Sequence, residues 1–218
     1  MNTHLIRRAL AVAAFAAVLP LQAQAASYVV NTDVPTGSLF MSNTVDSGNW
    51  IAERFTVSAP TQIDSIAAYL LSSDTTGADI GKTFTIALYG NSTVAGNSLP
   101  ALNFGLPSQG QLFQATATYT ADGWNGVSGL NWTVAAGSYW VALEGGADSN
   151  SALYLQAPTG AQPAAEAVAY FDGSGTRYKA TGLSDSFGLQ VTAVPEPSSI
   201  ALVLSGLGML AFATRRRG

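Results

Sequence analysis

Short segments along the middle of the chain alternate apolar and polar residues, which is the pattern of β-strands with one buried face. In the segment WIAERFTV, residues 50–57, three apolar side chains share one face with a single acidic residue, Glu53. Such segments end at Gly, Asn, Asp or Pro, and no helical period persists beyond a few residues. The pattern predicts strands at residues 50–57, 63–71, 83–89, 112–120, 130–134, 138–144, 151–156, 167–171, 177–180 and 186–192.

About ten short strands, separated by turns in a chain with 22 glycines, predict an all-β fold. The expected architecture is an antiparallel two-sheet sandwich of the jelly-roll type, and a closed barrel is the alternative. Residues 159–167, which contain Pro163 and several alanines, are the one place where a short helix or a long loop is expected to interrupt the strands.

The first 25 residues have the three parts of a cleavable export signal. Two arginines precede an apolar stretch at residues 9–19, and the small residues Ala23 and Ala25 flank a glutamine before the expected cleavage point. An uncleaved membrane anchor is the alternative, but it needs about 20 apolar residues, and only about a dozen are present here. We therefore expect the mature chain to begin at Ala26.

The C-terminus carries a second membrane-directed signal. An uncharged run of about 16 or 17 residues, at 198–214, is expected to form a helix of about 25 Å, long enough to span a bilayer with some thinning. The basic residues after it are expected to stay in the cytoplasm, which places the preceding body on the outer side of the inner membrane. In order, the signal contains Pro195, Glu196 and Pro197, then the uncharged run, then Arg215, Arg216 and Arg217.

These three features resemble the PEP-CTERM sorting signal, with residues 195–218 as the tail. The resemblance implies that an exosortase-type membrane protease processes the tail. It also implies transient anchoring by the tail helix, followed by delivery to the cell surface or the extracellular matrix. Such systems usually accompany exopolysaccharide and biofilm production. A plain tail anchor is the alternative interpretation.

Residues 26–194 are expected to form one domain, by the usual size of about 100 to 200 residues. Four of its strand motifs resemble the bacterial surface modules called choice-of-anchor domains, most closely the R type. Such modules occur with interchangeable sorting tails, and the resemblance implies no catalytic residue. The motifs are ERFTV at 53–57, TIALY at 85–89, AAGSYWVALE at 135–144 and FGLQV at 187–191.

Composition removes several function classes. The body, residues 26–194, has four basic and twelve acidic residues, a net charge of −8, so nucleic-acid binding is not expected. The chain has no cysteine, and its one histidine, His4, lies in the segment expected to be removed. Catalytic systems that need histidine or cysteine, and metal sites built from them, are therefore excluded from the mature body.

Composition does not exclude catalysis by carboxylate side chains. Glycoside hydrolysis needs two carboxyl groups about 5 to 9.5 Å apart, but no spacing in the sequence selects a pair. Glu53 and Glu144 interrupt apolar strands, where each needs a partner, and Arg54 and Lys82 are the candidates. The sequence predicts a non-enzymatic protein, with a carboxylate-dependent glycan-processing enzyme as the alternative.

No cofactor is predicted, and calcium is the one alternative, because oxygen ligands suit an extracellular loop without imidazole. Asp74 and Asp79 are the candidate ligands, in a loop at residues 74–79. The loop lacks the full alternating acidic pattern of a calcium site, and Asp next to Gly is common in simple turns.

Sugar binding needs exposed aromatic rings with amides or carboxylates nearby. Asp122, Trp124 and Asn125 have that composition, in a segment with two glycines that predicts a turn holding the indole outward. Trp50 is a further candidate. The alternative is that the large rings fill the core.

The sequence therefore predicts an exported surface or matrix protein, either structural or in contact with exopolysaccharide. Its expected partners are an exosortase-type protease, the membrane before processing, and a polysaccharide.

Overall fold

The computed structural model describes residues 27–35, 39–72, 79–101, 110–145, 153–156, 166–173, 178–180 and 187–194. These residues form 14 strands and no helix. Among them, accordingly, no helix is long and apolar enough to span a bilayer. Several predicted features lie outside the described residues: Ala23, Ala25, Asp74, Pro195, Glu196, Pro197, Arg215, Arg216 and Arg217.

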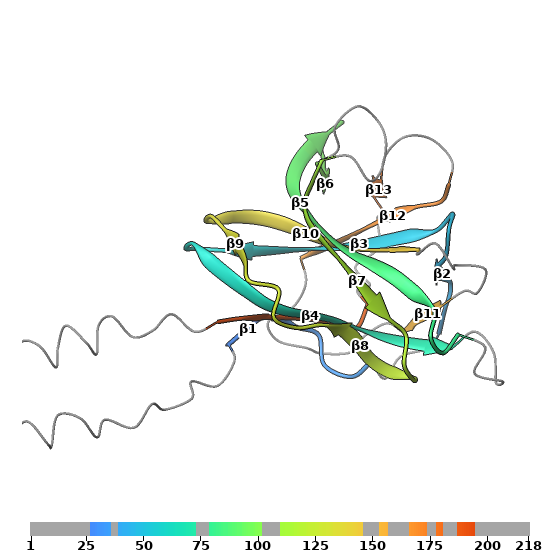
Figure 1. Cartoon of the computed structure of the whole chain (residues 1–218). Helices are drawn as coiled ribbons and strands as arrows, with labels where there is room; N and C mark the ends of the chain where they lie inside the picture. The colour runs from blue at the N-terminus through green and yellow to red at the C-terminus, as the bar shows by residue number, and fades with distance from the viewer. Residues whose placement is uncertain are drawn as a thin grey trace, which may run out of the picture.

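The strands form two antiparallel sheets, which confirms the predicted all-β sandwich (Figure 1). In spatial order, the first sheet contains β1 (Ser27–Asn31), β14 (Leu189–Ala193), β4 (Thr61–Ser72), β11 (Leu153–Gln156) and β2 (Leu39–Val45), and β8 (Gly123–Val127) and β9 (Trp132–Val134) also pair with β4. The second contains β13 (Lys179–Ala180), β12 (Ala167–Phe171), β3 (Trp50–Val57), β10 (Gly137–Gly145), β5 (Thr83–Val94) and β6 (Asn97–Pro100), and β7 (Gln111–Thr118) also pairs with β5.

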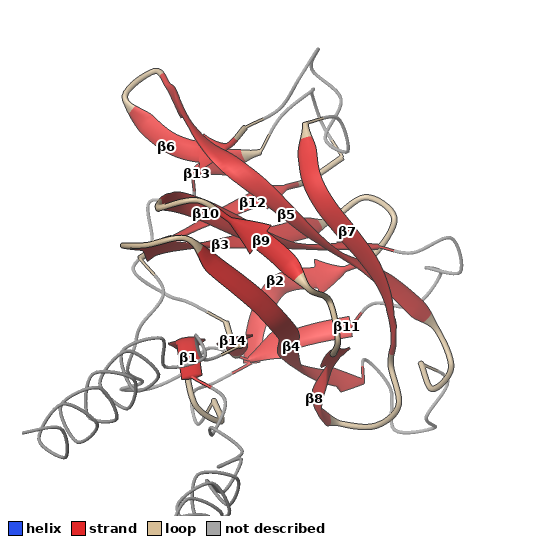
Figure 2. Ribbon diagram, turned by 60° about the vertical axis from the view of Figure 1, so that its left-hand side comes forward, coloured by secondary structure: helices blue, strands red, loops and turns tan. Residues whose placement is uncertain are grey.

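Successive strands often change sheet, as in a jelly roll. The chain passes from β2 in the first sheet to β3 in the second, returns to β4, and crosses again to β5. Figure 2 shows the two layers, with β4, β8 and β11 in one and β3, β5 and β10 in the other. Because of this alternation, most strand neighbours are distant in sequence.

The main core lies between the sheets, as the alternating pattern predicts. Phe55 of β3, Ile86 of β5 and Val141 of β10 face Ile66 of β4 and Val191 of β14, and each of these side chains is at most 1% exposed. The face of β3 that carries Ile51, Phe55 and Val57 is buried, as predicted.

The outer face of the second sheet carries a second buried layer, which the sequence pattern did not predict. Strand pairing places four fully buried alanines in one row across β12, β3, β10 and β5. The rings of Trp140, Tyr89 and Tyr178 belong to the same cluster, and each is 0% exposed. Small residues keep the floor of the layer flat, so large rings pack over it. The row is Ala169, Ala52, Ala142 and Ala87.

Candidate functional site

Glu144, at the end of β10, is a carboxylate buried in the second layer. Its Oε1 atom accepts hydrogen bonds from the hydroxyls of Tyr89 at 2.6 Å and Tyr178 at 3.0 Å, and its Oε2 accepts one from Gln111 Nε2 at 3.0 Å. Burial raises the pKa of Glu144, while these hydrogen bonds oppose the rise. Both oxygens are thus bonded to the protein itself, an arrangement that stabilises the second layer.

The predicted partners of the buried acids were wrong. Glu53 Oε1 accepts the backbone N–H of Phe187 at 2.6 Å. Arg54 instead pairs with Glu166, Nε to Oε2 at 3.0 Å, on the opposite face of β3. The prediction failed because adjacent residues in a strand point to opposite sides of the sheet.

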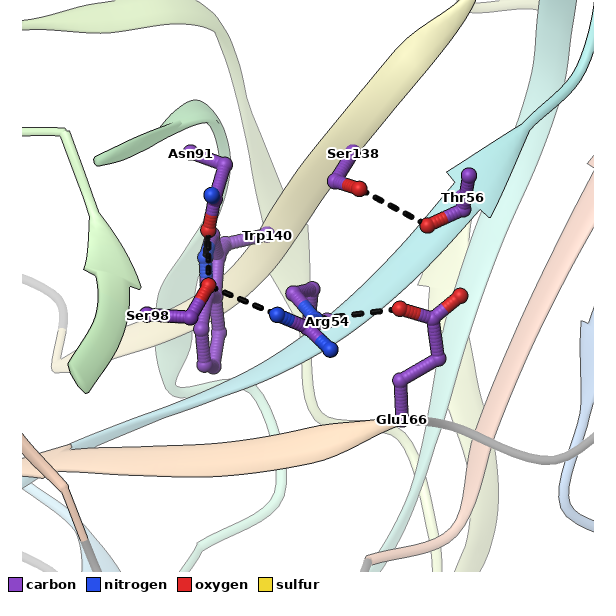
Figure 3. Close-up of polar contacts among 7 residues, drawn as sticks. All are labelled: Arg54, Thr56, Asn91, Ser98, Ser138, Trp140 and Glu166. Carbon is purple, nitrogen blue, oxygen red and sulfur yellow. Dashed lines mark hydrogen bonds and ion pairs between the residues drawn. The ribbon is translucent and has the colours of Figure 1, made fainter. Parts of the chain in front are cut away.

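Figure 3 shows polar side chains near Trp140 of the second layer, contributed by β3, β5, β6 and β10 and by Glu166. Arg54 lies between Glu166 and Ser98, whose hydroxyl is 2.7 Å from Nη1. The indole N–H of the fully buried Trp140 donates to Asn91 Oδ1 at 2.9 Å. Trp140 therefore fills the fold, as the alternative interpretation of the tryptophans predicted.

Trp132 also fills the interior. It is 8% exposed and stacks on Phe113, with ring centroids 5.3 Å apart and ring planes 12° from parallel. Neither Trp132 nor Trp140 presents its ring face to a ligand.

The two candidate calcium ligands are not seen together, because only Asp79 belongs to the described residues. Its Oδ2 accepts the hydroxyl of Ser72 at 2.7 Å, and its Oδ1 lies 3.9 Å from Lys82 Nζ. Within the described part of the chain, no three Asp, Glu, His or Cys side chains gather closely enough to hold a metal ion. Calcium binding stays a prediction.

Two of the predicted sugar-contacting residues shape the turn before β8. Asn125 is 3% exposed; its amide oxygen accepts the N–H of Thr120 at 2.8 Å, and its amide nitrogen donates to the carbonyls of Ala121 and Gly123, each at 2.9 Å. Asp122 accepts the N–H of Ser72 at 2.7 Å and the hydroxyl of Tyr119. These hydrogen bonds, Tyr119 first, lower the pKa of Asp122.

Trp124 lies in strand β8, and not in the turn that the sequence predicts. Its register partner on β4 is Tyr69, and the two rings meet edge to face with centroids 5.4 Å apart. Ala68 and Leu70, on either side of Tyr69, are fully buried between the sheets, so Tyr69 points to the outer face. Both aromatic side chains are half-buried. We call Tyr69 and Trp124 the aromatic platform.

The outer face beside the platform carries amides and hydroxyls. Gln190 of β14 donates its amide N–H to Asn31 of β1 at 3.2 Å, and the hydroxyls of Ser65 and Thr192 are 2.5 Å apart. A Cβ on Gly188 would lie 2.3 Å from the Cβ of Tyr69, so a glycine is required where the chain passes Tyr69 just before β14. Aromatic rings flanked by neutral hydrogen-bonding groups are suited to a sugar chain.

Trp50 does not join this surface. It lies on β3 in the second sheet, where its ring packs against Phe171 with centroids 5.0 Å apart. The structure therefore brings Asp122, Trp124 and Asn125 together, and separates Trp50 from them. Tyr69 was missed, although the alternation of Ile66, Ala68 and Leu70 already placed it on the outward face.

The comparisons with known proteins concern the end of the chain. A model of the PEP-CTERM protein-sorting motif matches residues 193–217. The chain carries a PEP-CTERM sorting motif. No protein with curated annotation matches the chain, and the resemblance of the body to choice-of-anchor domains stays a prediction.

The PEP-CTERM match has consequences for where the protein goes. It implies export, transient membrane anchoring, processing by an exosortase, which is a membrane protease, and surface or extracellular release. The match begins at Ala193, the last residue of β14, so the PEP-CTERM motif is continuous with the folded body.

Proposed function

We propose that this PEP-CTERM protein is a non-enzymatic component of the cell surface or extracellular matrix, and that its aromatic platform contacts exopolysaccharide. The PEP-CTERM motif supports this proposal, because it implies surface or extracellular release, and exopolysaccharide is an extracellular polymer. Tyr69 and Trp124 then offer two ring surfaces on an open sheet, with amides on neighbouring strands. The single observation that carries the proposal is the outward-facing Tyr69–Trp124 pair.

Rings of this kind bind sugars because the C–H faces of pyranose units are apolar and leave water when they stack. A half-buried indole also keeps its orientation in the free protein, so less conformational entropy is lost on binding. The edge-to-face contact with Tyr69 fixes the indole in this way.

The test is co-sedimentation of the purified body with exopolysaccharide from the producing strain. We expect Trp124→Ala and Tyr69→Ala each to weaken binding at least tenfold, which corresponds to about 1.4 kcal/mol. Leu112→Ala is the matched control, because Leu112 is 50% exposed on β7 in the second sheet. Unchanged affinity in both platform variants, with folding verified by circular dichroism, would remove polysaccharide contact at this site.

The absence of catalysis is part of the proposal, and the bonding of Glu144 supports it. A general acid must reach the oxygen of the leaving group, whereas both Glu144 oxygens are bonded to Tyr89, Tyr178 and Gln111. We expect no release of reducing ends from the same exopolysaccharide. Release that disappears in Glu144→Gln would favour the glycan-processing alternative.

A further inference from the structure

The body and the sorting motif meet without a linker. Ala193 pairs with Ser27 of β1 and with Ile63 of β4, and the backbone N–H of Val194 donates to the carbonyl of Gln62 at 2.9 Å. Pro195, which opens the Pro-Glu-Pro segment, is the next residue. The hydrogen-bonded sheet therefore continues up to the start of the tail.

This short connection limits how far the body stands from the membrane. Three residues lie between Val194 and Ser198, where the uncharged run begins, and the four residue steps from Val194 to Ser198 span at most about 14 Å when extended. The headgroup layer on each side of a bilayer is about 5 to 7 Å thick. When the tail helix spans the bilayer, the sheet at Val194 must lie at or just above the headgroups.

The end of the sandwich that carries Val194 is the end that must lie close to the headgroups, and we call it the proximal end (Figure 1). Pairing of Thr61 with Val134 and of Gly137 with Val57 brings the β3–β4 and β9–β10 turns to the same end as Ala193. The proximal end consists of Ser27, residues 58–62, Asn131, residues 133–137 and Val194.

The chemistry of the proximal end differs from that of the opposite end. Residues 55–63, 123–143 and 187–194 contain no Asp, Glu, Lys or Arg, and Asp64 of β4 is the acidic residue next to them in the sequence. Exposed apolar residues occur at both ends, with Val194 (38% exposed) and Tyr28 (47%) on or beside the proximal end and Ile80 (61%) at the opposite end, so the two ends differ in charge. Tyrosine is favoured at the membrane interface because it is apolar with a polar tip.

The opposite, distal end carries charge. The loop between β2 and β3 contains Asp46, and the ends of β4, β5 and β7 bring together Asp79, Lys82 and Asp122. Acidic side chains outnumber basic ones there, so an anionic lipid surface repels this end more than the uncharged one. Charge and chain length therefore favour the same orientation.

We propose that the proximal end is a membrane-contact surface, and that the short connection holds it against the outer headgroup layer of the inner membrane until the tail is processed. The occupant is the lipid bilayer itself. This inference rests on the proposed sorting role, because it requires the tail helix to be inserted.

Single-cysteine labelling tests the orientation, since the chain has no cysteine of its own. Ala59→Cys places a fluorophore at the exposed β3–β4 turn of the proximal end, and Ser47→Cys places one at the exposed distal turn. The protein, produced with its own export signal and tail, is reconstituted into phosphatidylethanolamine and phosphatidylglycerol vesicles that contain a headgroup-nitroxide lipid. We expect nitroxide quenching at least threefold stronger at Ala59 than at Ser47.

A linker variant supplies the matched control. Twenty Gly and Ser residues inserted between Val194 and Pro195 add an average reach of about 25 Å, so quenching at Ala59 should fall to the level at Ser47. Equal quenching at the two sites, or unchanged quenching after the insertion, would overturn the proposal. Flotation with the vesicles separates the two ideas: protein that fails to float refutes anchoring by the tail, and with it the contact. Protein that floats with equal quenching refutes the contact alone.

Discussion

At the scale of single residues, the buried acids show how a low-charge fold accommodates its few carboxylates. Glu144 is 4% exposed and Glu53 is 0% exposed, and each accepts hydrogen bonds from segments distant in sequence. The sequence predicted that both would need partners, because both interrupt apolar strands. It did not predict the partners, since Phe187 lies 134 positions from Glu53 and only the sheet order brings them together.

The raised pKa of Glu144 makes a pH-dependent prediction. Because the folded state holds this proton more tightly than the unfolded chain, its contribution to stability is fully present below the ordinary pKa of 4.5 and is lost as pH rises through the raised value. Glu144→Gln removes this titration while keeping an oxygen for the two tyrosines. We expect the free energy of unfolding of the wild type, minus that of the variant, to fall as pH rises from 4 to 8 in urea titrations.

Asp122 does not disturb that comparison. Its lowered pKa makes the opposite contribution, which is present above its ordinary pKa of 3.8 and is lost as pH falls through the folded value, and both proteins retain it. A difference between wild type and Glu144→Gln that stays constant with pH would contradict the prediction. Glu144→Leu should be more damaging, by about 1–3 kcal/mol for each buried hydroxyl left unpaired.

At the scale of elements, hydrophobic alternation predicted the strands whose two faces differ. The interval of β3 was predicted as found, and those of β4 and β5 were too short, because both strands run for 12 residues. Strand β8 was predicted as a turn, since its sequence GWNGV is rich in turn-forming residues. It becomes a strand because β4 is long enough to offer it five register partners. The contact between Tyr69 and Trp124 therefore could not be predicted from the local sequence pattern.

Substitution of Gly126 tests whether the close approach of the β8 and β4 backbones requires glycine. A Cβ there would lie 2.2 Å from the carbonyl oxygen of Ile66 and 2.6 Å from the Cα of Ala67, so the backbones would have to separate. We expect Gly126→Ala to lower the free energy of unfolding by about 1–3 kcal/mol, and to weaken polysaccharide binding by displacing Trp124.

The matched control is Gly90→Ala in β5. A Cβ at Gly90 meets nothing closer than 3.9 Å, so alanine in this strand should be neutral or stabilising by up to about 1 kcal/mol. Thermal unfolding of both variants checks the pair. Equal losses of stability would mean that the close approach at Gly126 is not what requires glycine there.

At the scale of the whole molecule, sequence pattern indicated the fold class but not the sheet order. Alternating strands require two facing sheets, whereas the position of β14 between β1 and β4 depends on contacts that span most of the chain. Strand β1 was not predicted at all. Thr32, just after it, is 1% exposed and bonds through its hydroxyl to the backbone of Leu189, which closes the first sheet around the final strand.

A designed disulfide tests this closure. Ser27 and Ala193 are register partners, and directly opposed residues on antiparallel strands have Cα atoms about 4.5 to 5.5 Å apart, within the range for a disulfide. We expect the oxidised double variant Ser27→Cys and Ala193→Cys to gain about 2–4 kcal/mol over its reduced form in thermal unfolding. Formation of the bond without any gain would indicate that β1 separates from β14 before the molecule unfolds.

The pairing of Ser27 with Ala193 also makes the body portable. Because its first and last strands are neighbours, the sandwich leaves and re-enters the rest of a polypeptide at almost one point. The body can therefore be inserted into an exposed loop of an unrelated host protein through two short linkers. Because the two ends of the body are adjacent, the insertion would not force the two sides of the host loop apart.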